Sequence, residues 1–145
     1  MQSEHSQYDE QWVQGMLGKL GKSKFRASFK LSVKDRRYAQ AKGLSTIDEH
    51  AHEMLSTRVG AAFPLKDGKQ TPYRGHPVFT AQHATGTCCR TCMERWYGIP
   101  KGHELTEDEI NHLCSVVMAW IERDLQEHPD RPGANGRDAE QLTLL

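Results

Sequence analysis

The most informative stretch of this sequence is residues 76–92, which read His76-Pro77-Val78-Phe79-Thr80-Ala81-Gln82-His83-Ala84-Thr85-Gly86-Thr87-Cys88-Cys89-Arg90-Thr91-Cys92. This stretch holds two of the eight histidines and three of the four cysteines in the chain. Imidazole and thiolate are ligands that suit zinc, and two cysteines separated by two residues can reach the same ion. The stretch therefore predicts a Zn²⁺ site.

Helix and turn signals divide the same stretch into two short helices. A helix is predicted over 77–84, and Gly86 predicts a turn after it. A second helix is predicted over 89–97 and ends at Gly98. Because the turn brings the end of the first helix against the start of the second, a bound ion would hold the two helices together.

Five residues of the stretch are candidate metal ligands. Cys89 and Cys92 lie three apart in the predicted second helix and present two sulfurs on one side. His83 precedes the turn and can approach them, so these three are the first choice. The fourth ligand is His76 or Cys88. His76 lies roughly 10 Å from His83 along the first helix, so it would have to approach from the preceding loop.

Two other interpretations of these residues remain open. They can be small buried residues of a packed helix pair, which would need no metal. Cys89 and Cys92 can also form a redox-active dithiol, because their spacing is that of a C-x-x-C motif. No βαβ pattern surrounds the motif, and this disfavours the redox interpretation.

The remaining sequence predicts an all-α fold. Four further segments have apolar residues at helical spacing; they span residues 8–20, 32–43, 46–59 and 106–128. Apolar and polar residues instead alternate around Phe25 and Phe29, which predicts a short extended arm near residues 24–31. With two short helices around the His/Cys metal site, we expect a compact single-domain helical protein of about six helices.

Capping signals and composition indicate the boundaries of these segments. The pairs Thr46–Glu49 and Thr106–Glu109 have capping-box spacing and predict helix starts. Residues 64–75 predict a long loop, and a loop of about 12 residues without secondary structure is often functional. We expect one helical domain over 1–128 and a flexible acidic and polar tail over 129–145, which lacks periodicity.

Charges are unevenly distributed along a chain whose formal net charge is zero. Residues 19–42 hold nine lysines and arginines and one acidic residue, whereas residues 104–145 hold ten acidic residues and three arginines. This asymmetry indicates either pairing within the protein or a polyanionic partner, which would be nucleic acid or an acidic protein. The candidate contact residues are Lys22, Lys24, Arg26, Lys30, Lys34, Arg36 and Arg37.

The sequence favours a cytoplasmic location without membrane contact. No apolar segment approaches the roughly 20 residues of a membrane span. The first residues lack the basic-then-apolar order of a signal peptide. In the cytoplasm thiols stay reduced, so clustered cysteines favour a metal site over disulfides.

Several motifs carry a resemblance to a known family; they read Asp67-Gly68-Lys69-Gln70-Thr71-Pro72, Arg74-Gly75-His76-Pro77-Val78-Phe79, Gln82-His83-Ala84-Thr85, Cys88-Cys89-Arg90 with Cys92, and Gly98-Ile99-Pro100-Lys101-Gly102. Together they resemble the bacterial and phage family catalogued as domain of unknown function 4186, over roughly residues 25–122. The resemblance implies a compact bacterial or phage protein whose His and Cys positions recur together, and it implies no activity. Tyr97 departs from the pattern, because relatives carry histidine there. If that histidine is a ligand in them, this chain uses another group.

The predicted site allows three classes of function. In the first, four protein ligands close the zinc site, which stabilises a small binding module. In the second, three ligands leave a position for water, and Glu94 or Glu53 is the base of a zinc hydrolase. In the third, the chain is a bacterial or phage protein-interaction factor, for which no single residue argues. The sequence names no reaction, so the binding module is the preferred hypothesis.

Overall fold

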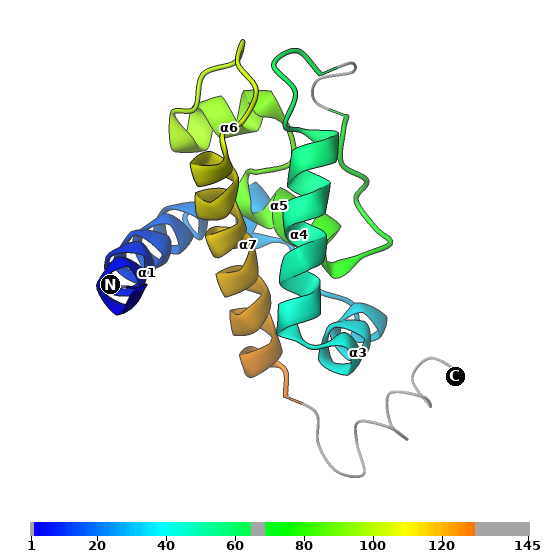
Figure 1. The fold of residues 1–145 in the computed structure, drawn as a ribbon. Helices are drawn as coiled ribbons and strands as arrows, with labels where there is room; N and C mark the ends of the chain where they lie inside the picture. The colour runs from blue at the N-terminus through cyan, green and yellow to red at the C-terminus, as the bar shows by residue number, and fades with distance from the viewer. Residues whose placement is uncertain (1, 65–68, 130–145) are drawn as a thin grey trace.

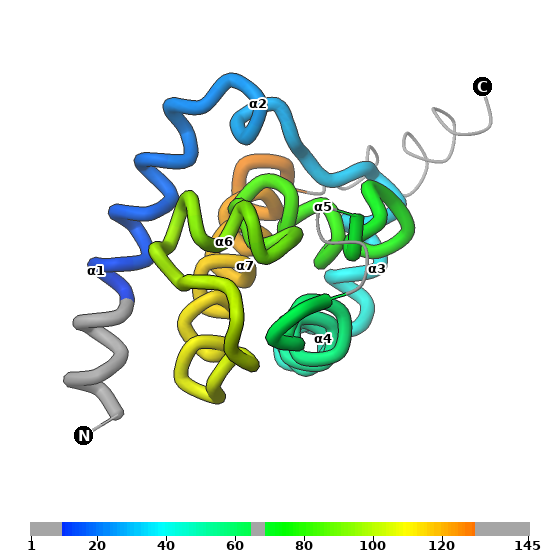
Figure 2. Tube along the Cα trace, turned by 90° about the horizontal axis from the view of Figure 1, so that it is seen from above, coloured from blue at the N-terminus to red at the C-terminus, as the bar shows by residue number. Residues whose placement is uncertain are grey.

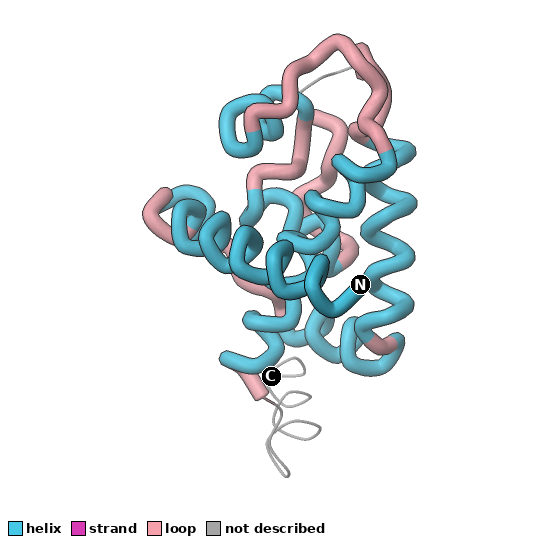
Figure 3. Tube along the Cα trace, turned by 60° about the vertical axis from the view of Figure 1, so that its left-hand side comes forward, coloured by secondary structure: helices cyan, strands magenta, loops and turns pink. Residues whose placement is uncertain are grey.

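The computed structural model describes residues 2–64 and 69–129, with side chains from Glu10 onward. These residues form seven α-helices joined by loops and contain no strand (Figures 1 and 3); the helices are α1 (Gln2–Leu20), α2 (Lys24–Ala27), α3 (Val33–Lys42), α4 (Leu44–Arg58), α5 (Pro77–Thr85), α6 (Arg90–Tyr97) and α7 (Glu107–Glu127). The predicted all-α fold is therefore confirmed. The predicted tail lies outside the described residues except for Pro129. None of the described helices is long and apolar enough to cross a membrane.

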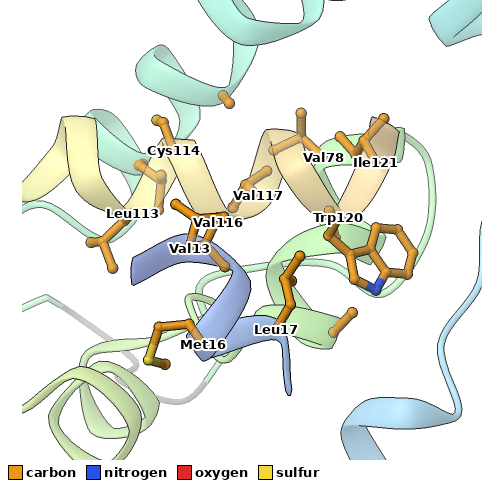
Figure 4. Packing of buried hydrophobic residues seen from close by; sticks show 14 of the residues in the cluster. Val13, Met16, Leu17, Val78, Leu113, Cys114, Val116, Val117, Trp120 and Ile121 are labelled. Atoms are coloured by element: carbon orange, nitrogen blue, oxygen red, sulfur yellow. The ribbon is translucent and has the colours of Figure 1, made fainter. Parts of the chain in front are cut away.

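Helix α7 lies at the centre of the fold. It packs against α4, α5 and α1, and Figure 2 shows it between α1 and α4. Its side chains Leu113, Val117 and Ile121 have no exposed area, and Val13 and Leu17 of α1 lie in the same cluster (Figure 4). Complete burial of one such side chain contributes about 1.5–3 kcal/mol. The apolar stripe predicted for residues 106–128 therefore forms the centre of the core.

Helix α5 is buried along its whole length. It begins after His76, whose Nδ1 atom accepts a hydrogen bond from the Val78 backbone N–H at 3.0 Å. It ends at Gly86, which has a φ of 71° and so lies in the left-handed region that favours glycine. A helix of nine residues is too short to be stable alone. Its contacts with α7, α2 and α3 therefore stabilise it.

The extended arm predicted near residues 24–31 is wrong for its first half. Residues Lys24–Ala27 form helix α2, because the Ser23 hydroxyl accepts a hydrogen bond from the Arg26 N–H and caps the helix. Phe25, an apolar residue of the alternating pattern, is 52% exposed. Arg26 is the buried residue of α2, whereas Leu31, beyond the end of this helix, lies in the apolar core.

One of the two predicted capping boxes is absent. Helix α4 begins at Leu44, two residues before Thr46, and has no side-chain cap. Gly43, with a φ of 90°, is both the C-cap of α3 and the N-cap of α4, so a single residue joins the two helices. Thr46 therefore lies inside α4 and does not cap it. In α7 the predicted box is present: Thr106 and Glu109 each accept a hydrogen bond from the other's backbone N–H.

Candidate metal centre

Three of the five predicted ligands lie together at the start of α6. The Sγ atoms of Cys88, Cys89 and Cys92 all lie within 4.8 Å of one another, and all three cysteines are free of disulfides. Cys89 is the N-cap of α6, and its sulfur accepts a hydrogen bond from the Cys92 backbone N–H at 3.4 Å. The helix start therefore places Cys92 over Cys89, and Cys88 joins them from the turn.

The spacing of these sulfurs fits a zinc ion. Two thiolates bound to one tetrahedral zinc through bonds of about 2.3 Å lie about 3.8 Å apart. The observed upper limit of 4.8 Å lets the three sulfurs reach that distance through small side-chain movements. Sulfur donors also suit zinc better than magnesium or calcium, which prefer oxygen. The N-terminus of α6 adds a favourable potential for negatively charged thiolates.

A buried cation lies against this cysteine cluster. The Arg26 guanidinium donates hydrogen bonds from Nη2 to Cys92 Sγ at 3.1 Å and from Nη1 to Cys88 Sγ at 3.7 Å. Its Nη1 atom also donates to the carbonyl oxygen of His83 at 2.6 Å. Arg26 is only 7% exposed. The sequence had placed this residue among the candidate nucleic-acid contacts, but its guanidinium faces the cysteines.

These neighbours separate the pKa values of the clustered thiols. The pKa of Cys92 lies well below the usual range, because its thiolate accepts hydrogen bonds from the Cys88 and Cys89 thiols and from Arg26. The pKa of Cys88 is raised, because its thiol donates to the other two sulfurs and is buried. Cys88 therefore keeps its proton until a cation replaces it, so metal binding releases protons.

His83 lies near the cluster but outside the group of atoms within 4.8 Å. Its Nε2 atom lies 3.1 Å from the Thr71 carbonyl oxygen. Burial lowers the pKa of His83, which favours the neutral ring. Because the carbonyl can only accept, Nε2 carries the proton of the neutral ring, and Nδ1 is the nitrogen with the lone pair. Metal-binding histidines commonly donate their second N–H to a carbonyl in this way.

His76 lies in a different environment from the cysteines. Its Nδ1 atom caps α5, and its Nε2 atom lies 3.0 Å from Nδ1 of His50 on α4. Burial and the neighbouring His50 lower the pKa of His76 to about 4. Sequence reasoning missed this pair, because the two residues are 26 positions apart and only the packing of α4 on α5 brings them together.

Residues outside the His/Cys pattern position the cluster. The Thr71 hydroxyl donates to the Cys88 carbonyl oxygen at 2.8 Å, and Gln82 donates from Nε2 to the Thr87 carbonyl oxygen at 3.1 Å. Both side chains are buried. Thr71 and Gln82 both belong to the motifs that carry the family resemblance, and this was the indication in the sequence that they matter. Threonine and glutamine are not typical metal ligands, so their residue types did not predict a role.

Tyr97, where the resemblance implies a histidine in relatives, also lies at this centre. Its hydroxyl donates to the Thr85 carbonyl oxygen at 2.7 Å. Burial raises the pKa of Tyr97, and Cys88 raises it further. The neutral phenol is therefore the stable form here, and its hydrogen bond ties the end of α6 to the end of α5.

The predicted basic and acidic candidates have varied environments. Arg36 donates from Nε to Asp124 Oδ1 at 2.7 Å, so this basic residue pairs with the acidic end of the chain. Lys22, Lys24, Lys30 and Lys34 are exposed. Glu53 and Glu94, the two predicted bases, are also exposed, and neither belongs to the cysteine group.

Comparison with known proteins identifies the family. The sequence model of the family described as Domain of unknown function (DUF4186) matches residues 14–122. This chain belongs to the DUF4186 family. The matched region contains α2 to α6 and the whole cysteine cluster. No solved structure matches the chain.

Proposed function

We propose that this DUF4186 protein is a zinc-stabilised helical binding module. Cys88, Cys89 and Cys92 supply three thiolates, and the close approach of their sulfurs is the observation that carries the proposal. We assign His83 as the fourth donor, through Nδ1, which requires its ring and the sulfurs to lie closer together than they do in this structure. Four protein ligands make a closed site, which contributes folding free energy rather than chemistry.

Charge balance supports the assignment of Arg26 to the same centre. Three thiolates and one Zn²⁺ ion carry a net charge of −1, and the Arg26 guanidinium offsets it. A buried charge that lacks such a partner is strongly destabilising. Arg26 also binds the His83 carbonyl oxygen, so one side chain connects α2 to both predicted ligand segments.

A zinc hydrolase is the competing function, because three sulfurs alone would leave a position for water. Such an enzyme needs a base near the metal-bound water. Among the described residues outside the cluster, Arg26 is the charged side chain that hydrogen-bonds to the sulfurs, and it cannot act as a base. Glu53 instead lies with acidic and polar residues of α4 and α7, beside a groove that contains none of the cysteines. We therefore favour the structural role.

The binding half of the proposal rests on the exposed cations near α2 and α3. Four lysines of this region are exposed, namely Lys22, Lys24, Lys30 and Lys34. Arg26 and Arg36 instead contact groups inside the protein. We propose that this face contacts a polyanion, either nucleic acid or an acidic protein. Reduced, clustered thiols suit the cytoplasm of a bacterial or phage-infected cell, which is where we place the protein.

Elemental analysis of the purified full-length protein tests the zinc assignment. We expect one zinc per chain in the wild type and none in the Cys92→Ser variant. Loss of the metal should lower the melting temperature by roughly 10 °C or more, since about 1 kcal/mol corresponds to a few degrees in a protein of this size.

Cys114→Ser is the matched control for this experiment. Cys114 is buried on α7, and no cysteine of the cluster groups with it. This variant should lose some stability but retain its zinc. A wild type that is folded without metal, and whose melt is unchanged by a strong chelator, would refute the zinc assignment.

A further inference from the structure

We propose that the surface formed by Phe25, Phe29 and Tyr73 binds single-stranded nucleic acid by stacking its bases. Tyr73 lies in the loop before α5, and the two phenylalanines lie on and just after α2. This inference rests on the proposed polyanion-binding function of the same face, and it names the partner. It does not depend on the number of zinc ions bound.

The ring of Tyr73 has one covered face and one open face. It lies parallel to the His83 ring, with centroids 3.9 Å apart and planes 9° apart. His83 is buried, whereas Tyr73 is 58% exposed. Tyr73 therefore covers His83 on its inner side and presents a flat π-face to solvent on its outer side. An exposed, rigidly supported tyrosine ring is the kind of group on which a nucleic-acid base stacks.

The aromatic surface continues from Tyr73 toward α2. The Phe29 ring lies 6.3 Å from the Tyr73 ring and 15° from parallel with it. The Phe25 ring lies 5.1 Å from Phe29 in an edge-to-face arrangement and is half exposed. Phe25 and Tyr73 are exposed, and the partly buried Phe29 ring lies between them and packs against the core. A single exposed aromatic residue needs no explanation, but two that are joined by a third ring form a continuous aromatic surface. Successive aromatic rings offer stacking sites for successive bases.

Cations surround a groove next to these rings. A groove of about 690 Å³ is lined by Phe29, Tyr73, Lys30, Lys34 and Arg74, and by the single carboxylate of Asp35. Its size is that of pockets for small organic ligands, which are roughly 300–1,000 Å³. Three cations against one carboxylate favour phosphate, and the adjacent rings favour bases. An acidic protein would satisfy the cations but would leave the open face of Tyr73 without a stacking partner.

Side chains of the candidate metal centre also contact this surface. Arg26 ties α2 to Cys88 and Cys92, and α2 carries Phe25. His83 contacts the Thr71 carbonyl oxygen and supports the Tyr73 ring. Phe25, through α2, and Tyr73, through His83, are therefore both connected to the His/Cys stretch of residues 76–92.

Fluorescence anisotropy with the full-length protein tests the proposal. We would compare labelled oligo(dT) and oligo(U) of about 15 nucleotides with a DNA duplex of equal length, over about 50 to 200 mM salt. We expect the single strands to bind more tightly than the duplex. Tyr73→Ala should weaken single-strand binding roughly 5- to 150-fold, whereas Tyr73→Phe should change it less than about 2-fold.

Two further variants separate stacking from charge. Phe63→Ala removes another exposed aromatic ring, 80% exposed and outside this surface, and should leave binding unchanged. A Lys30→Ala and Arg74→Ala double variant should reduce the slope of log affinity against log salt by about 1.4, or about 0.7 per phosphate contact. Zinc content and thermal melts of each variant show that the fold is intact.

The outcomes distinguish this inference from the proposed function. Equal binding of duplex and single strand, with no effect of Tyr73→Ala, would overturn the stacking proposal but leave a polyanion-binding face. Binding of a polyglutamate peptide as tight as that of oligo(dT) would also overturn it. Absence of binding to every polyanion would overturn both, whereas zinc content tests the metal assignment by itself.

Discussion

At the scale of single residues, Arg26 makes the most informative contacts of the candidate metal centre. Its guanidinium contacts Cys88, Cys92 and the His83 carbonyl oxygen, which together use its planar set of donors. A lysine in its place offers one point charge and cannot reach all three acceptors with comparable geometry. Arg26 therefore both offsets the charge of the thiolates and fixes α2 against α5.

We predict that Arg26→Met weakens zinc binding by about 10- to 100-fold, as is typical when a group that contacts the metal ligands is removed. The zinc affinity of the Arg26→Lys variant should lie between that of the Arg26→Met variant and that of the wild type. Competition with a chromophoric chelator measures the affinity. Lys24→Met, on the same short helix but exposed, is the matched control and should bind zinc normally. Equal affinities for the Arg26→Met and Lys24→Met variants would show that Arg26 does not support the site.

At the scale of secondary-structure elements, the turn between α5 and α6 sets the geometry of the centre. Gly86 has a φ of 71°, and a Cβ atom placed there would lie 2.6 Å from Cδ1 of Trp96. Trp96 belongs to α6, so the two helices meet closely at this glycine. Arg90 of the same helix donates to the carbonyl oxygens of Ala61, Pro100 and His103 and so binds two loops to α6.

We predict that Gly86→Ala destabilises the protein by about 2–4 kcal/mol, because backbone strain and overpacking add. It should also lower zinc affinity, because the turn positions Cys88 relative to α5. Chemical denaturation measures the first effect and chelator competition the second. Gly15→Ala is the control: a Cβ atom at Gly15 meets nothing within 4 Å. This change in α1 should stabilise the protein by roughly 0.5–1 kcal/mol. A Gly86→Ala variant as stable as the wild type would contradict the packing at this turn.

At the scale of the whole molecule, two buried polar contacts connect helices that are distant in sequence. His76, at the start of α5, pairs with His50 of α4. Asp124 of α7 accepts from Arg36 of α3 and from the Leu31 backbone N–H. The second contact joins the basic front and the acidic back of the chain. The intramolecular pairing that the sequence allowed therefore occurs for one of the candidate basic residues.

The His76 contact makes stability depend on pH. Its folded pKa of about 4 lies below the ordinary 6.5, so the unfolded state binds the proton more readily. The contribution of neutral His76 to the free energy of unfolding is therefore fully present above pH 6.5 and is lost as the pH falls toward 4. The loss is at most about 3 kcal/mol. Urea denaturation at about pH 7.5 and about pH 4.5 measures it.

His76→Asn provides the comparison for this pH effect. An asparagine oxygen can also cap α5, but it does not titrate in this range. Acid release of zinc affects wild type and variant alike, so the difference between their losses isolates His76. We expect the wild type to lose more stability than the variant between the two pH values. Equal losses would show that the pKa of His76 is not lowered in the folded protein.

Much of the fold followed from local rules in the sequence. The apolar stripe of α7, its Thr106 capping box and the glycine that ends α5 each act within a few residues, so their effects can be read along the chain. The clustering of Cys89 and Cys92 also follows from one helical turn. The family resemblance marked the same region, although it implied no activity.

The remaining features depend on contacts between distant residues. The periodicity around Phe25 predicted an extended arm, but the burial of Arg26 against cysteines more than 60 positions away favours a helix there. His76 has the residue type of a ligand, yet the packing of α4 pairs it with His50. Side-chain chemistry and spacing limit what a residue can do locally, whereas long-range packing selects which partner it meets.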